Sequence, residues 1–143
     1  MTKTHLFFDS RDRDFIRVCR SLMDGPRGMA ITSLRELAEA ALACGAPRYY
    51  VDIDFAYNML MRMKVAGVMP SRPKARKMWE EIAAKVGVVM RTHKKISLIR
   101  AVTEVIVREP ASGFFIEPVT ALRILRRYNR RCKSRPFSFP RSK

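Results

Sequence analysis

The sequence predicts an all-α protein made of two similar three-helix units in tandem, with at most a short two-stranded β pair and a basic C-terminal tail. Apolar residues recur at helical spacing in six segments, each bounded by capping residues, glycine or proline. Residues 31–63 also align without gaps on residues 96–128, at an offset of 65 positions. With 48% hydrophobic residues in 143, the chain can bury a core.

Seven of the 33 aligned positions are identical, and many others pair two apolar residues. Tyr49-Tyr50-Val51 falls on Phe114-Phe115-Ile116, so an aromatic, aromatic, β-branched triplet recurs at the same offset. Shared helical periodicity is the alternative explanation, but the triplet favours an internal duplication. The identical pairs are Ile31 with Ile96, Arg35 with Arg100, Glu39 with Glu104, Ala46 with Ala111, Ala56 with Ala121, Leu60 with Leu125 and Arg62 with Arg127.

The first helix of each unit is predicted from an apolar stripe. One runs from near Ser10 to Asp24, carries Phe15 and Cys19 on its inner face, and stops at Gly25-Pro26. Its counterpart runs from about residue 74 to residue 86 and places Trp79 and Ile82 at the same spacing. These two helices open the two units.

The second helix of the first unit follows a serine cap. Ser33 with Glu36 fits a capping box, in which a hydroxyl and a carboxylate bind free backbone N–H groups. The buried stripe that follows includes Leu34, Leu37 and Ala41. The counterpart spans residues 97–108 and is ended by Pro110.

The third helices follow the aromatic triplets, which we expect to be short extended segments. Asp52 caps a helix over residues 53–66 that Gly67 ends. In the second unit Pro118 aligns with Ile53, and proline is favoured at the first position of a helix. We expect each triplet to pack its aromatic rings against the helix that follows. The two triplets are also our candidates for the β pair.

The predicted boundaries are 1–67 for the first helical unit, 68–133 for the second unit packed on the first, and 134–143 for the tail. Residues 68–74, with two prolines, join the units. The tail has two prolines, three basic residues and no acidic residue, so we expect a segment that is flexible or ordered only by a partner.

The net charge of +16 is the strongest global property of the chain. Residues 1–54 hold eight Lys/Arg and eight Asp/Glu, whereas residues 55–143 hold 21 and five. Such a chain favours polyanionic partners, with nucleic acid first. The expected phosphate-binding residues are Arg72, Lys74, Arg76, Lys77, Lys94, Lys95, Arg123, Arg126, Arg127, Arg130, Arg131 and Lys133.

Other side chains that could bind a metal or a base are better explained by structural roles. Three cysteines, Cys19, Cys44 and Cys132, show no CxxC spacing, which argues against a disulfide framework and a zinc site. The acidic pairs Asp9–Asp14 and Asp52–Asp54 stand at predicted helix starts, where carboxylates cap. His5 and His93 have no partner at ligand spacing. We expect the four triplet rings to supply core area rather than to stack on bases.

No phosphate-loop, dinucleotide-binding, nucleophile-elbow or metalloprotease motif is present, so we expect no enzyme, no cofactor and no metal. No secretory signal or membrane-length apolar run is visible, which predicts a cytoplasmic protein, nucleoid- or particle-associated, with no membrane partner. The expected function is non-enzymatic nucleic-acid binding, DNA before RNA, through phosphate contacts. The alternative is a structural component of a ribonucleoprotein or viral particle that docks through its basic half and tail.

Overall fold

The computed structural model describes residues 3–139, which form six α-helices and one short 3₁₀ turn and contain no β-sheet. The helices are α1 Lys3–Asp24, α2 Leu34–Leu42, α3 Ile53–Ala66, α4 Pro73–Thr92, α5 Leu98–Arg108 and α6 Pro118–Arg131. The expected all-α class is confirmed.

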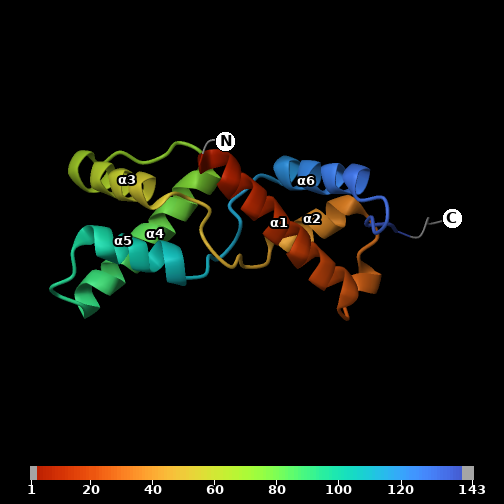
Figure 1. Ribbon diagram of the computed structural model, residues 1–143, viewed down its shortest axis with the longest axis horizontal. Coiled ribbons are helices and arrows are strands. Elements are labelled where there is room, and N and C mark those ends of the chain that lie inside the picture. The colour runs from red at the N-terminus through yellow and green to blue at the C-terminus, as the bar shows by residue number, and fades with distance from the viewer. Residues whose placement is uncertain (1–2, 140–143) are drawn as a thin grey trace. The chain divides into compact units, whose positions relative to one another are not determined.

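The chain divides into two compact units (Figure 1). Unit 1 is the stretch Pro47–Ala111, with α3, α4 and α5, joined by the first turns of α1. Unit 2 combines Asp9–Ala46 with the chain from Ser112 onward, and so contains most of α1 together with α2 and α6. Each unit therefore draws its third helix from the other predicted half of the chain, and the compact units do not follow a boundary at residue 68.

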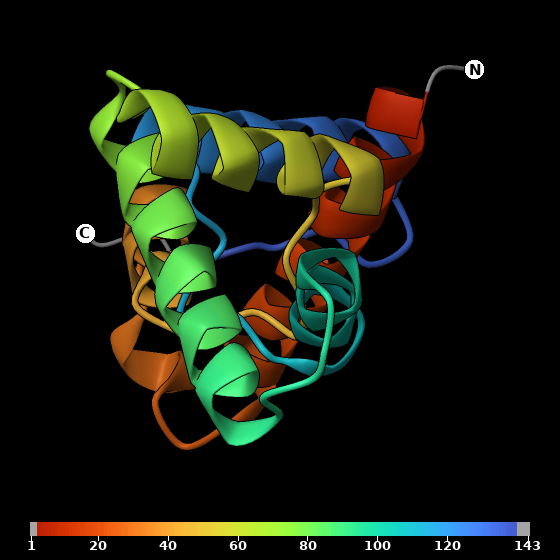
Figure 2. The same cartoon turned by 90° about the vertical axis from the view of Figure 1, so that its left-hand side faces the viewer.

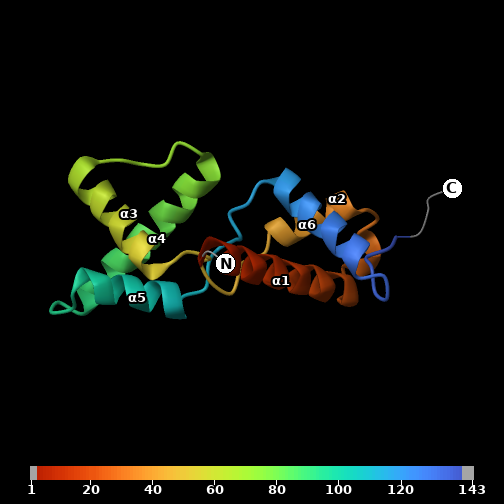
Figure 3. The ribbon, with the colours of Figure 1, turned by 45° about the horizontal axis from the view of Figure 1, so that its top comes forward.

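In unit 1, α4 and α5 form a helical hairpin (Figures 1 and 3). Figure 2 shows the turn that joins the end of α4 to the start of α5. The core of unit 1 contains the buried Trp79, Ile82 and Val86 of α4 and the apolar stripe of α5, and α3 packs on α5. Tyr49 is also buried here, where its hydroxyl donates a 2.7 Å hydrogen bond to Glu81. Burial and this hydrogen bond raise the pKa of Tyr49 above its usual range.

In unit 2, α6 packs along α2, and α1 contributes the buried Phe15 and Cys19. The ring of Phe114 meets that of Phe15 edge to face, with centroids 5.2 Å apart. Burial raises the pKa of the Cys19 thiol to about 12, so this cysteine is a small core residue, as predicted.

Local capping explains most of the helix ends. Ser33, Asp52 and Ser97 each accept a hydrogen bond from the backbone N–H three residues ahead, which confirms the predicted caps Ser33 and Asp52. Glu36 reaches back to Thr32 rather than to Ser33, so the capping box is shifted by one residue. Gly67 ends α3 with φ of +63°, in the left-handed region that favours glycine.

Two helices are longer than predicted. The first begins at Lys3 rather than near Ser10, so Asp9 and Asp14 lie inside α1 and do not cap it. The N-terminal His5 lies in this helix, but its side chain is outside the described residues. The helix α4 continues past Val86 to Thr92. The cap prediction for Asp9 and Asp14 is wrong because a helix tolerates polar residues at positions that point away from its core.

The triplets are not strands. Residues 49–51 and 114–116 have no strand assignment, and Ala46 and Ala111 are single bridge residues, so the predicted β pair is wrong. Phe115 has φ of +56°, which bends the backbone away from an extended course. The side chains anchor these segments instead, because Tyr49 and Phe114 are buried while Tyr50 and Phe115 are half-buried.

Candidate nucleic-acid interface

The helix α6 presents a cationic face because its apolar positions are used for packing. Pro118 begins the helix, and Ala121, Ile124 and Leu125 are buried against unit 2. After Val119, every exposed position of the helix holds arginine. Arg123, Arg126, Arg127, Arg130 and Arg131 are all exposed, as is Lys133 just after the helix.

No acidic side chain of residues 8–139 forms an ion pair with this face. Glu117 is the single acidic residue in the chain from Ser112 onward. Among the described residues, none of the five exposed arginines of α6 takes part in an ion pair. Arg130 and Arg131 lie in the last turn, where positive charge is favoured by the helix dipole, but the earlier arginines have no such local partner.

The segment after α6, as far as Phe139, folds back onto unit 2, whereas we expected a tail that is flexible or ordered only by a partner. Phe137 is 5% exposed, and Asn129 holds its backbone in two hydrogen bonds of 2.8 and 2.9 Å. The guanidinium of Arg20 lies 4.2 Å from the centre of the Phe137 ring. The same group donates to the Tyr128 hydroxyl at 2.8 Å and to the Arg135 carbonyl at 2.7 Å.

The docked segment carries the last two cations of the described chain, Lys133 and Arg135. Arg135 approaches Asp24 at 3.5 Å, so it is partly neutralised, whereas Lys133 is exposed. Phe139 is half-buried, and residues 140–143 lie outside the described residues. Cys132 sits at the start of the segment, where hydrogen bonds from Tyr128 and Ser134 lower the pKa of its thiol. The sequence pattern did not single out Arg20 or Asn129. Arg20 binds residues more than 100 positions later in the chain, and Asn129 binds an irregular segment, so neither contact follows a helical spacing.

The cations predicted in unit 1 fall at the two ends of α4. Arg72, Lys74, Arg76 and Lys77 are exposed at its start, and Arg76 forms an ion pair with Glu80 at 3.2 Å. Lys94 and Lys95 are exposed in the turn after its end. Twenty helical residues separate these groups by roughly 30 Å. The structure therefore brings the unit 1 residues together as two clusters rather than one.

The charge divides more evenly between the units than along the sequence. Residues 47–111 carry 13 Lys/Arg and six Asp/Glu, a net charge of +7. Residues 9–46 and 112–143 together carry 15 and seven, a net charge of +8. The neutral N-terminal segment is combined with the most basic segment in unit 2. Both units are thus cationic, and in unit 2 the excess lies on α6 and the chain that follows it.

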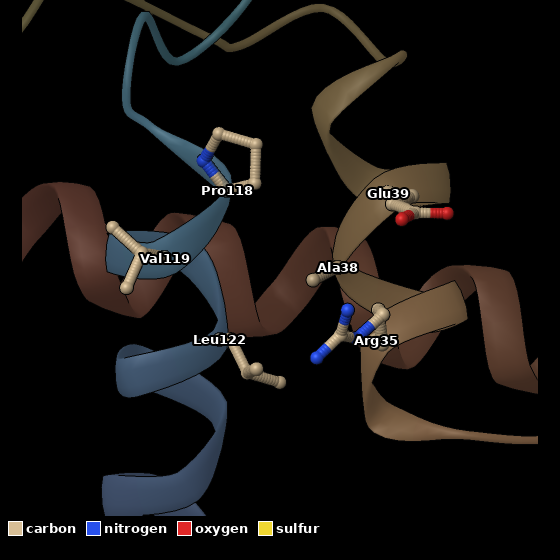
Figure 4. Close-up of a pocket in the computed structure, with 6 residues that line it drawn as sticks. All are labelled: Arg35, Ala38, Glu39, Pro118, Val119 and Leu122. Atoms are coloured by element: carbon tan, nitrogen blue, oxygen red, sulfur yellow. The ribbon is translucent and has the colours of Figure 1, made fainter.

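A small pocket lies beside the cationic face, between α2 and α6 (Figure 4). Its volume is about 210 Å³, and Ala38, Val119 and Leu122 supply apolar walls. Figure 4 shows the Arg35 side chain of α2 directed toward Leu122 of α6. Ligand-binding clefts usually measure about 300–1,000 Å³, so this space is small for a ligand.

The described residues contain no group of three or more His, Cys, Asp or Glu side chains that could hold a metal ion. His93 is exposed in the turn between α4 and α5. No helix in the described part of the chain is long and apolar enough to cross a bilayer. The chain matches no known protein-family model, no curated protein and no solved structure.

Proposed function

We propose that this protein binds nucleic acid without catalysis, DNA in preference to RNA, mainly through phosphate contacts. The observation that carries the proposal is the row of exposed arginines on α6 that no acidic side chain neutralises. Arginines without acidic partners form a positive field that attracts phosphates, and their binding releases the counterions condensed on the nucleic acid.

The geometry of α6 suits a phosphate backbone. Its arginines, from Arg123 to Arg131, span roughly 12 Å, which corresponds to about three to four phosphate steps of 3.4 Å on one strand. The arginine fork can bind a phosphate with two hydrogen bonds, which a lysine point charge cannot do. The two clusters at the ends of α4 extend the phosphate-binding surface in unit 1. DNA is favoured because no recognised RNA-binding module is present.

The alternative, a component of a larger particle that docks through its basic half and tail, is less well supported. A tail that orders only on its partner would favour that alternative, but Phe137 is already held within unit 2 by Arg20 and Asn129. Association with a nucleoid would follow from DNA binding.

The internal duplication is part of the proposal. The third helices both have 14 residues, start at positions 65 apart and bury Ala56 and Leu60 in one copy, Ala121 and Leu125 in the other. We expect an experimental structure to superpose α4, α5 and α3 on α1, α2 and α6 in that order. A different packing order within the two units would contradict the duplication.

Charge reversal on α6 tests the binding surface. We expect the triple variant Arg127→Glu, Arg130→Glu, Arg131→Glu to weaken binding to every DNA sequence alike and to lower the salt slope, by about 2.7 if all three arginines contact phosphates. Fluorescence anisotropy with labelled duplexes at several salt concentrations measures both quantities.

A matched control keeps the total charge change the same. Arg13, Arg17 and Arg27 are exposed in unit 2 but lie outside the proposed surface. Reversal of these three should reduce affinity only through the general field of the protein. Equal losses for the two triple variants would show that net charge, and not the α6 face, determines binding.

A further inference from the structure

Unit 1 contains a larger cleft between α4 and α5, which are tied together at one end. The Lys85 amine on α4 donates a 2.5 Å hydrogen bond to the carbonyl of Pro110, just after α5. The cleft has a volume of about 650 Å³, within the usual range for ligand sites and about three times the volume of the pocket beside α6. Val89 and Ile96 are half-buried and contribute an apolar part of its wall.

The charged side chains of the cleft are arranged in order along the hairpin. His93, Lys95 and Arg100 line the end near the turn between the helices. Glu104 and Arg108 follow one and two turns farther along α5 and pair with each other at 3.2 Å. Glu109 lines the far end, just after α5.

This arrangement leaves one cationic end and one acidic end. Among the described residues, Lys95 and Arg100 form no ion pair, whereas Arg108 is already neutralised by Glu104. Glu109 is exposed and has no ion pair among the same residues. Glu109 lies nine positions after Arg100, which is roughly 13 Å along the axis of α5. A ligand that fits both ends carries an anion at one end and a hydrogen-bond donor at the other.

We infer that the cleft binds one unpaired nucleotide of a nucleic-acid strand, with its phosphate at Lys95 and Arg100 and the amino group of its base at Glu109. This inference rests on the proposed function and names one specific nucleotide-binding site. A carboxylate accepts a hydrogen bond from the exocyclic amine of cytosine, while it would repel the carbonyl of thymine at that position. The sugar and the ring face lie against Val89 and Ile96.

A nuclear magnetic resonance titration of the full chain tests the inference. His93 and His5 are the two histidines of the chain, so the imidazole signals of His93 can be assigned with the variant His93→Gln. We expect deoxycytidine monophosphate to shift the His93 signals in a saturable manner. We also expect it to bind about fivefold or more tightly than inorganic phosphate or thymidine monophosphate.

Three variants test the two ends of the nucleotide-binding cleft separately. Lys95→Gln with Arg100→Gln should weaken binding of deoxycytidine monophosphate by about tenfold, because a charge-assisted contact to phosphate is lost. Glu109→Gln should remove the preference for cytosine over thymine. Arg62→Gln with Lys64→Gln removes the same charge from exposed positions of α3 and should leave mononucleotide binding unchanged.

Several results would overturn the inference. Equal affinity for inorganic phosphate and for deoxycytidine monophosphate would mean that the cleft is an anion site only. His93 signals that stay unchanged, while the chain still binds single-stranded DNA, would place the contacts elsewhere. Failure of the proposed function is recognised separately, because the chain would then bind no oligonucleotide in the anisotropy titration.

Discussion

At the scale of residues, a few polar side chains hold the irregular segments that connect the helices. Asn129 binds both the N–H and the carbonyl of Phe137, and Arg20 covers the ring of that residue. Together they bring the chain after α6 back onto unit 2, with Lys133 remaining exposed beside the arginines of α6. The residues that support the candidate interface are thus as important to it as the cations themselves.

Replacement of Asn129 should release this segment. The variant Asn129→Ala loses two hydrogen bonds to Phe137, each worth about 0.5–1.5 kcal/mol. We expect the backbone amide of Phe137 to be protected from hydrogen exchange in the parent protein and to exchange about tenfold faster or more in the variant. Asn58→Ala, an exposed substitution on α3, is the control. Unchanged protection of the Phe137 amide in Asn129→Ala would contradict the proposed support.

At the scale of elements, the sequence predicted those helix ends that depend on a local chemical signal. The start and end of α3 were predicted to the residue because the Asp52 cap and Gly67 act within one turn. The start of α6 was predicted for the same reason, since proline is favoured at the first helical position. The start of α1 was missed because Asp9 and Ser10 resemble caps but lie in a continuing helix.

Such local signals do not predict which helices pack against each other. The stripes on α3 and α6 have the same apolar pattern, so the pattern does not specify that α6 packs on α2 and α3 on α5. The cationic residues of α6 were identified from composition and spacing, whereas the cleft between α4 and α5 depends on a tertiary hairpin. Long-range packing therefore decides what local sequence leaves open.

Two glycine substitutions should change stability in opposite directions. Gly67→Ala forces a side chain into a backbone with φ of +63° and should lower the free energy of unfolding by about 1 kcal/mol. Gly87→Ala lies inside α4, where the new methyl group would meet only the flexible end of Arg91 at 3.3 Å. It should raise the free energy of unfolding by about 0.5–1 kcal/mol.

Urea unfolding followed by circular dichroism measures both glycine effects. Because the two variants add the same methyl group, each is the control for the other. A loss of stability in Gly87→Ala as large as that in Gly67→Ala would contradict the assigned backbone conformations.

At the scale of the whole molecule, the main stretch of unit 1, Pro47–Ala111, interrupts unit 2 in the sequence. The residues of unit 2 that flank the interruption lie near each other, since a Cβ added to Gly113 would be 3.9 Å from the carbonyl oxygen of Cys44. Such an arrangement resembles the insertion of one domain into another at a surface point. It also explains how a chain with a neutral N-terminal segment yields two cationic units.

The fragment 47–111 should therefore fold alone, whereas the fragment 1–67 should not. The first contains α3, α4 and α5 with the core around Trp79, while the second has α3 without the α5 on which it packs. We expect 47–111 to show a helical circular dichroism spectrum and a cooperative thermal transition. Cooperative folding of 1–67, with 47–111 unfolded, would contradict the division into these units.

The central claim is that cationic helical surfaces bind the phosphates of DNA. The most direct test is an anisotropy titration of the intact protein with duplex DNA, single-stranded DNA and structured RNA at several salt concentrations. We expect tight binding of DNA at low salt, a steep fall in affinity with rising salt, and weaker binding of the RNA. Absence of binding to all three ligands at low salt would contradict it.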